Sequence, residues 1–204
     1  HGIYYNTDLF KKLELKIPQT WGELLKTAQI IKEAGYIPFA NNSGGYVEFG
    51  DWNTITVSQQ NSEVGEDIFM ALAPSIIGGK EEREKYLSGQ QCFNDGKVVN
   101  VFKAVAALKP FLSPNHANMK YKDALQLFLD GKAPMWMAGS WQIPMLESKA
   151  KSFNWSVFAI PSPSNLNYMI FHPDIGIGLN AASQHKEEAK KFLEWLTTPV
   201  AGQL

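Results

Sequence analysis

The clearest pattern of apolar and polar positions lies over residues 17–36, IPQTWGELLKTAQIIKEAGY, and predicts a helix. Thr20 is the predicted N-cap, and Glu23, three residues later, completes a capping box that satisfies the first free amide donors. Gly35 suits the left-handed conformation that ends many helices. The apolar positions recur at helical spacing and predict one buried face, made of Leu24, Leu25, Ala28 and Ile31.

Weaker helical patterns lie at residues 52–60, 63–72, 95–111 and 121–131. The third predicts an apolar face of Val98, Val101, Phe102, Val105 and Leu108, and the fourth ends at Gly131. A last helix begins after Ser183 as N-cap and ends before Pro199, with Ala189, Phe192, Leu193 and Leu196 on its apolar face. The segment 79–91 is rich in charge and is expected to be a solvated segment.

Short apolar runs bounded by Gly, Pro or Asn predict strands, and they are IPFA (37–40), APMWMAG (133–139), NWSVFAIP (154–161) and DIGIGLN (174–180). Residues 41–53, NNSGGYVEFGDWN, predict a loop, in which a plain turn is expected at Asn41, Asn42 and Ser43. The segment 161–169 is rich in Pro and Ser and is the best candidate for a linker or hinge. Helices mixed with isolated strands indicate an α/β fold.

The amino-acid composition narrows the range of possible functions. The 204 residues are 45% hydrophobic and 19% charged, which is typical of a globular domain, or of one domain with part of another. A formal net charge of −1 gives no field that would draw nucleic acid. The single cysteine, Cys92, allows no internal disulfide, and a buried or bystander thiol is expected there rather than a nucleophile. Aromatic residues reach 12%, which suits either a large core or surfaces that stack on flat amphipathic ligands such as sugars.

Four stretches, in order along nearly the whole chain, resemble the sugar-binding family of bacterial extracellular solute-binding proteins, the receptors of ABC importers. They are residues 4–40, with Tyr-Asn-x-Asp-x-Phe and Pro-x-Thr-Trp-x-Glu, then FLDGKAPMWMAGSW (128–141), FAIPSPS (158–164) and GIGLNAASQHKEEAKKFLEWLTTPVAGQ (176–203). No single stretch is specific, but their common order is. The resemblance is to the family-1, maltose-binding-protein-like members, and it implies an α/β fold of the periplasmic-binding-protein type II kind.

The resemblance also implies how the chain is organised. Residues 1–168 would form most of the second, C-terminal lobe of a two-lobe receptor. Residues 169–204 would return to the first lobe and add a strand and a helix to it. A first lobe of about a hundred residues is expected before Tyr4, and further helices after Pro199, so that the chain is a fragment holding half of the binding cleft. The family's partners are a sugar or oligosaccharide and the membrane permease, and its location is extracellular or periplasmic, with a lipid anchor expected on the full-length protein.

The first candidate site is the end of the strand GKAPMWMAGSW, at Gly139, Ser140 and Trp141. Ser140 is expected to cap the next helix, which places Trp141 in its first turn and aims the nearby backbone amides at the same space. The C–H faces of a sugar lie flat on aromatic rings, and the resemblance implies this role for Trp141. The alternative is a tryptophan in the core or at a domain interface, which is the expectation for Trp136, between Met135 and Met137.

The second candidate site is the stretch YVEFGDWN, with Tyr46, Glu48, Asp51, Trp52 and Asn53. The carboxylates, amide and rings suit sugar hydroxyls and C–H faces, and the resemblance implies a cleft-lining loop in this region. The alternative is a helix start, with Asp51 as N-cap and Trp52 as the first helical residue. Trp21, Trp155 and Trp195 are expected to be structural.

The sequence predicts no enzyme, no metal site and no cofactor. The four histidines are scattered, and no Gly-x-Ser-x-Gly or phosphate-binding loop is present. A glycosidase needs two carboxylates about 5–9.5 Å apart, and Glu48 with Asp51 would serve on spacing alone. The alternatives to a receptor for a carbohydrate are therefore a glycosidase-like fragment and a module that binds another protein.

Overall fold

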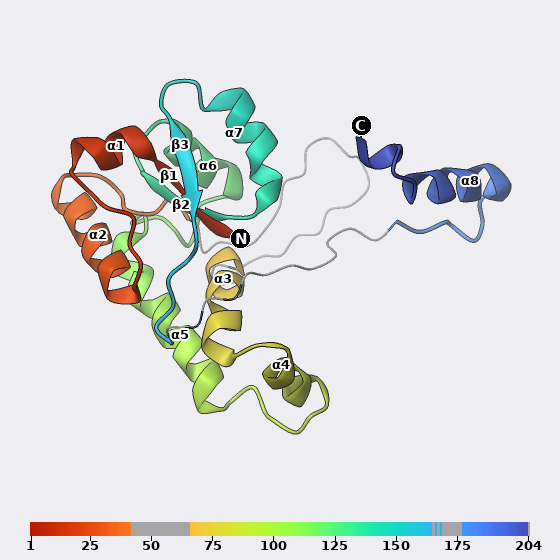
Figure 1. The fold of residues 1–204 in the computed structure, drawn as a ribbon, viewed down its shortest axis with the longest axis horizontal. Coiled ribbons are helices and arrows are strands. Elements are labelled where there is room, and N and C mark those ends of the chain that lie inside the picture. Colours follow the sequence, from red (N-terminus) through yellow and green to blue (C-terminus); the bar gives the residue numbers. More distant parts are fainter. Residues whose placement is uncertain (42–65, 165, 167, 169–176, 204) are drawn as a thin grey trace. The chain divides into compact units, whose positions relative to one another are not determined.

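The computed structural model describes residues 1–41, 66–164, 166, 168 and 177–203 (Figure 1). The chain divides into two compact units, His1–Ile170 and Phe171–Leu204. Each unit is described by itself. The predicted helix at 52–60 and most of the predicted loop at 41–53 lie outside the described residues.

The first unit is built on a three-stranded antiparallel sheet with the order β2-β1-β3. The strands are β1 (Gly2–Asn6), β2 (Met135–Ala138) and β3 (Trp155–Phe158), so the predicted strands at 133–139 and 154–161 are confirmed. No element is predicted over β1 from the sequence. Every residue of β1 is buried, and Tyr4 pairs with Trp136 on one side and with Val157 on the other. β1 is therefore the central strand, which explains why its apolar residues do not alternate with polar ones.

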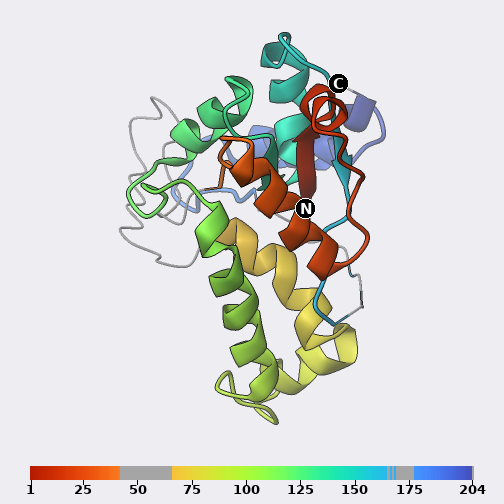
Figure 2. The ribbon, with the colours of Figure 1, turned by 90° about the vertical axis from the view of Figure 1, so that its left-hand side faces the viewer.

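Helices cover both faces of this sheet. Ile3, Tyr5, Met135 and Met137 face a core formed with α1 (Thr7–Lys12), α2 (Trp21–Glu33), α3 (Glu66–Ile77) and α5 (Gly96–Leu108). The opposite face carries Tyr4 and Trp136 and packs against α6 (Tyr121–Leu129) and α7 (Ile143–Lys149). Figures 1 and 2 show the two groups of helices around the strands. Both faces of β2 are thus buried, and this segment reaches solvent only beyond the end of the strand.

The local signals at α2 and α6 predict the structure well. Thr20 accepts a hydrogen bond from the amide of Glu23 at 3.2 Å, and the Glu23 carboxylate accepts one from the amide of Thr20, so the capping box is confirmed. Gly35 and Gly131 come after the two helices with φ of 87° and 68°, the left-handed region that favours glycine. Of the predicted apolar face of α2, Leu24, Ala28 and Ile31 are buried.

The structure refines two predictions for the middle of the chain and corrects one, at Phe102. The helix predicted at 63–72 is α3, at Glu66–Ile77. The charged segment 79–91 contains a helix, α4 (Lys80–Leu87), which remains largely exposed but buries Tyr86. α5 runs alongside α3 and buries Val98, Val101, Ala104 and Leu108 (Figure 2). Phe102 lies one position off this face, is 47% exposed and packs on the ring of Phe69 at 5.2 Å.

The predicted strand at 37–40 reduces to a single bridging residue. Phe39 pairs in parallel with Leu112, which comes after the 3-10 turn η1 (Lys109–Phe111), and with Met135 of β2. Asn41 then closes the segment, because its side-chain amide donates to the Met137 carbonyl at 2.7 Å and its oxygen accepts from the Met137 amide at 2.8 Å. The side-chain amide of Asn41 therefore makes with Met137 the two hydrogen bonds that the backbone of a neighbouring strand residue would make.

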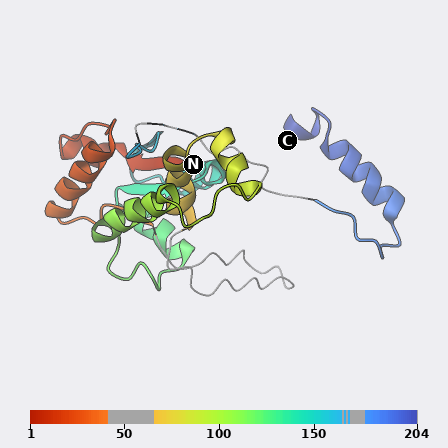
Figure 3. The same ribbon diagram turned by 90° about the horizontal axis from the view of Figure 1, so that it is seen from below.

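In the second unit, the described residues contain α8 (Lys186–Leu196) and a 3-10 turn, η3 (Ala201–Gln203) (Figure 3). Residues 177–180 of the predicted strand at 174–180 form no strand with other described residues. His185, not Ser183, is the N-cap residue of α8, and Ser183 accepts a hydrogen bond from the His185 amide at 3.2 Å. No residue of α8 is buried among the described residues, and Phe192 and Trp195 stack on each other at 5.8 Å.

Candidate functional site

Trp141 lies where the buried strand β2 gives way to solvent. β2 ends at Ala138, Gly139 turns the chain, and the 3-10 turn η2 (Ser140–Gln142) leads directly into α7. The side chain of Trp141 is 41% exposed, whereas Trp136, five residues earlier, is 0% exposed. The structure thus separates the two tryptophans into a surface ring and a core ring. The expectation of a core residue at Trp136 is confirmed.

The predicted cap at Ser140 is wrong. Gly139 is the N-cap residue of η2, Gln142 is that of α7, and neither turn has a side-chain cap hydrogen bond. Ser140 lies inside the 3-10 turn, so its side chain is not in the position of a cap. Pro144, at the second position of α7, also removes one of the amide donors that a cap would satisfy. Trp141 still lies in the turn that opens this helical segment.

Tyr121 and His1 contact the indole of Trp141, and Gln142 contacts the hydroxyl of Tyr121. The indole Nε1–H donates to the hydroxyl of Tyr121 at 3.3 Å, and Tyr121 is the first residue of α6. The same hydroxyl accepts a hydrogen bond from the side-chain amide of Gln142, which is 3% exposed. The ring of His1 meets the indole edge to face, with centroids 5.1 Å apart and planes at 88°. These contacts leave part of the ring exposed to solvent.

Gly139 lies directly against this ring. A Cβ at this position would stand well under 3.0 Å from three carbon atoms of the Trp141 ring, which is closer than side chains tolerate. The Gly139 carbonyl accepts a hydrogen bond from the hydroxyl of Tyr4 at 3.1 Å, and burial raises the pKa of that hydroxyl. The backbone beside the ring is therefore hydrogen-bonded to the central strand, β1.

The structure brings only part of the predicted site together. Gly139, Ser140 and Trp141 are adjacent in space, while the second candidate stretch, with Tyr46, Glu48, Asp51, Trp52 and Asn53, lies outside the described residues, as do Asn42 and Ser43. Asn41 is 1% exposed and serves the backbone of β2 rather than a surface. Tyr121 and Gln142 are neighbours of Trp141 that the sequence pattern did not predict.

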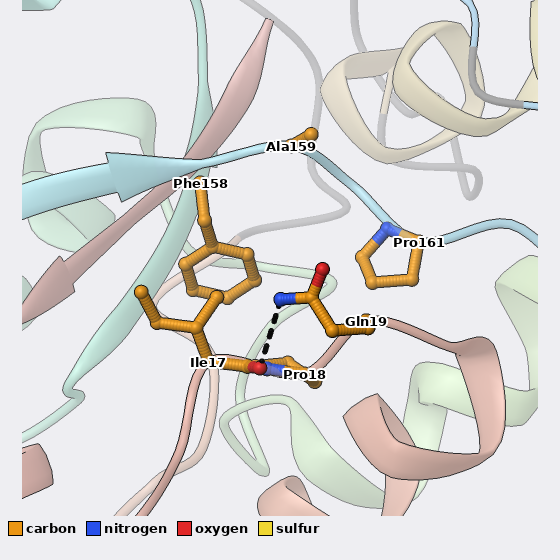
Figure 4. A pocket seen from close by; sticks show the side chains of 6 residues that line it. All are labelled: Ile17, Pro18, Gln19, Phe158, Ala159 and Pro161. Atoms are coloured by element: carbon orange, nitrogen blue, oxygen red, sulfur yellow. Dashed lines mark hydrogen bonds between the residues drawn. The ribbon is translucent and has the colours of Figure 1, made fainter.

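A small pocket elsewhere in the first unit has few polar groups that could bind a ligand. It lies between the chain that precedes α2 and the end of β3 (Figure 4), and it is lined by Ile17, Pro18, Gln19, Phe158, Ala159 and Pro161. Its one polar side chain, Gln19, already donates to the Ile17 carbonyl at 3.1 Å. Trp141 is not among its residues, and no charged group lines it. The exposed ring of Trp141 is therefore the better candidate for ligand binding.

The carboxyl groups of the candidate pair, Glu48 and Asp51, lie outside the described residues. Hydrogen bonds lower the pKa of Asp8, Glu82, Asp95 and Asp130, whereas a glycosidase needs one carboxyl group with a raised pKa. Desolvation and the neighbouring Asp95 raise the pKa of Tyr86 to about 12, so it is a neutral hydrogen-bond donor. Among the described residues, no group of His, Cys, Asp or Glu side chains could hold a metal ion. Cys92 is exposed.

These features describe an α/β unit with an exposed tryptophan at the end of a buried strand, and sequence comparison gives the class of the protein. Residues 1–203 match the family of bacterial extracellular solute-binding proteins, and the chain belongs to this family. The family is one of binding proteins, and its place is outside the cytoplasmic membrane. None of the helices in the described parts of the chain is both long and apolar enough to cross a bilayer.

Individual relatives make the comparison more specific. The chain is 28% identical to the multiple sugar-binding protein of Streptococcus mutans serotype c, over 99% of this chain and 46% of that protein. It is 27% identical to an uncharacterized ABC transporter extracellular-binding protein of Pyrococcus horikoshii, over 96% of this chain and 40% of that protein. The chain therefore spans less than half the length of these curated relatives.

Solved structures confirm the α/β fold. RafE from Streptococcus pneumoniae in its apo form is 25% identical, with a TM-score of 0.63 over 99% of this chain and 50% of that one. RafE in complex with raffinose is 26% identical, with a TM-score of 0.66 and the same coverage. A sugar transporter of Bacillus licheniformis in complex with stachyose is 18% identical, with a TM-score of 0.64 over 97% of this chain and 50% of that one, and shows the fold alone.

Proposed function

We propose that this chain is part of the solute receptor of a carbohydrate ABC importer and that Trp141 is a platform on which a sugar ring stacks. The observation that carries the proposal is a 41% exposed indole held at the end of a strand whose own residues are all buried. Stacking on the C–H face of a sugar uses an amphipathic ring of this kind. Support comes from relatives described as a multiple sugar-binding protein and as a complex with raffinose.

The receptor works by closing two lobes around the sugar. Residues 1–168 supply the second lobe with Trp141, and residues 169–204 return to the first lobe. The amphipathic pattern of α8 supports this assignment, since Phe192, Leu193 and Leu196 lie on one face and such a face packs on a neighbouring surface. Closure is favoured by the ligand because only the closed form presents both halves of the site. Further contacts to hydroxyls and C–H faces are proposed for Gly139, Ser140, Tyr46, Glu48, Asp51, Trp52 and Asn53.

The closed receptor then delivers its sugar to the permease subunits in the membrane. Delivery requires the receptor to stay near the outer face of that membrane, and a lipid anchor on the full-length protein would hold it there. The proposal needs no cofactor, because capture and release use only hydrogen bonds, stacking and a change in domain angle.

Calorimetric titration of the full-length natural protein with a panel of oligosaccharides, including raffinose and stachyose, tests the proposal. We expect saturable binding of at least one sugar, and we expect the sugar to be recovered unchanged after long incubation. Hydrolysed products would favour the glycosidase. No heat and no thermal shift with any sugar of the panel would favour a protein-binding module.

We expect Trp141→Ala to weaken the affinity for the sugar by more than tenfold, because the variant loses the stacking surface. A tenfold change corresponds to about 1.4 kcal/mol, which is within the range of one aromatic contact. Trp21→Ala on α2 is the matched control, since it removes a second indole that packs against the core on the other face of the sheet. An unchanged dissociation constant in Trp141→Ala would remove this residue from the site.

A further inference from the structure

We propose that Tyr121 is a positioning residue that holds the indole of Trp141 in a fixed plane, and that Gly139 is a glycine because this plane lies against its Cα. The inference rests on the proposed function in taking Trp141 as the sugar platform. It adds the reason why an exposed ring can bind well: its orientation is set before the ligand arrives.

The hydrogen bond to Tyr121 fixes one edge of the indole. Trp141 Nε1–H donates to the Tyr121 hydroxyl at 3.3 Å, and the buried amide of Gln142 donates to the same oxygen. An exposed side chain without such a bond samples several rotamers and loses about 0.5–1.5 kcal/mol of entropy when a ligand immobilises it. The bond to Tyr121 removes much of that loss from the binding step.

Tyr121 is itself anchored to the core. Its ring packs on Trp136 with centroids 5.7 Å apart and planes at 53°. Trp136 is 0% exposed and packs in turn against Phe128 of α6 at 5.9 Å. A continuous set of packed rings therefore connects the core to the exposed indole, so the hydroxyl that receives the indole N–H has a fixed position.

Gly139 fixes the opposite side of the ring. Its backbone has φ −93° and ψ 170°, which any residue adopts, so the glycine is not required by its conformation. The three atoms nearest to a Cβ placed there all belong to the ring of Trp141. Alanine at this position would therefore displace the indole from its plane, while the Tyr4 hydroxyl and the Gly139 carbonyl keep the backbone in place.

The first test uses Tyr121→Phe in the full-length natural protein, read by the indole 1H–15N resonance of Trp141 and by the affinity for the sugar that binds best. The resonance is identified by its loss in Trp141→Phe. We expect its chemical shift to change without sugar, and the dissociation constant to rise about threefold to tenfold, as for the loss of one hydrogen bond. Tyr36→Phe is the matched control, since its hydroxyl contacts Lys12 at 3.5 Å, and it should change neither.

An unchanged resonance in Tyr121→Phe would overturn the inference, and so would a changed resonance with unchanged affinity. If the natural protein binds no sugar of the panel, the proposed function fails. In that case the indole resonance in Tyr121→Phe still shows whether Tyr121 holds the indole. A failure of the proposed function is thus distinguished from a failure of the positioning role of Tyr121.

The second test is a double-mutant cycle of Gly139→Ala and Trp141→Ala. Gly139→Ala should weaken sugar binding by about tenfold or more in the natural protein and should have no further effect when Trp141 is already alanine. Gly22→Ala in α2 is the matched control, because nothing lies within 4 Å of its added Cβ, and it should leave the affinity unchanged. Equal losses in both backgrounds would show that Gly139 acts on something other than the ring and would overturn its assignment.

Discussion

Two tryptophans five residues apart have opposite environments, and the short turn between them is the cause. Trp136 is fully buried between the sheet and α6, while Trp141 is 41% exposed beyond Gly139. A strand covered on both faces allows no exposed side chain, so an indole reaches solvent only where the strand has ended. The same residue type therefore belongs to the core at Trp136 and to the solvent-exposed surface at Trp141.

Replacing the two rings should separate stability from binding. We expect Trp136→Ala to lower the free energy of unfolding by about 3–5 kcal/mol, because it leaves a large cavity. Trp136→Phe should cost less, since it also removes a buried indole N–H that has no hydrogen-bond partner among the described residues. Trp141→Ala should cost about 1 kcal/mol or less. Thermal unfolding ranks the three variants, and equal losses for Trp136→Ala and Trp141→Ala would contradict this ranking.

At single residues, the sequence predicted the features that depend on local spacing. The alternation around Trp136 and the Gly-Ser break before Trp141 distinguished a core ring from a surface ring. The contact between Trp141 and Tyr121 could not be predicted, because it joins residues 20 positions apart on different elements. The cap at Ser140 was predicted wrongly because a 3-10 turn, which leaves no simple polarity pattern, precedes α7.

Helix α1 is held to the start of β3 by a carboxylate rather than by apolar packing alone. Asp8, in the first turn of α1, accepts a hydrogen bond from the backbone amide of Asn154 at 2.8 Å and two more from its side chain at 3.2 Å. The backbone bond lowers the pKa of Asp8 most, the side-chain bonds next. Two segments that lie far apart in the sequence are thus connected through one acidic group.

This connection predicts an acid-dependent loss of stability. Since folding lowers the pKa of Asp8, its contribution is present above its ordinary value of 3.8 and is lost as the pH falls through the lower folded value. We expect Asp8→Asn to unfold at a lower temperature than the natural protein at pH 7 and to approach it as the pH falls below about 4. Thermal unfolding measured across this range is the test. If the unfolding temperatures of the two proteins change in parallel with pH, Asp8 contributes nothing to the loss of stability at low pH.

At the level of elements, helices with strong end signals were predicted and the central strand was not. The capping box and Gly35 define α2 from the sequence alone, because caps and left-handed glycines are local features. The pairing partners of β1 lie more than 120 residues away in the sequence, so only the folded sheet shows that it is the central strand. Helical spacing predicted Phe102 on the buried face of α5, but its side chain is 47% exposed and packs beside Phe69.

For the whole molecule, we expect residues 1–204 to hold only part of a site. The chain covers 46% of its Streptococcus mutans relative and 50% of the RafE chain, and in the proposed receptor the sugar contacts both lobes. Residues 1–204 alone should bind the sugar with a dissociation constant weaker than about 1 mM, while the full-length protein binds it far more tightly. Calorimetry on residues 1–204 and on the full-length protein compares the two dissociation constants. A dissociation constant of about 1 μM for residues 1–204 alone would show that one lobe suffices.

The crystal structure of the full-length protein with its tightest oligosaccharide tests the role of Trp141 most directly. We predict a sugar ring lying flat on the exposed face of Trp141, with the indole still bonded to Tyr121 and close against Gly139. A sugar bound elsewhere, with Trp141 in contact only with solvent or protein, would contradict this prediction.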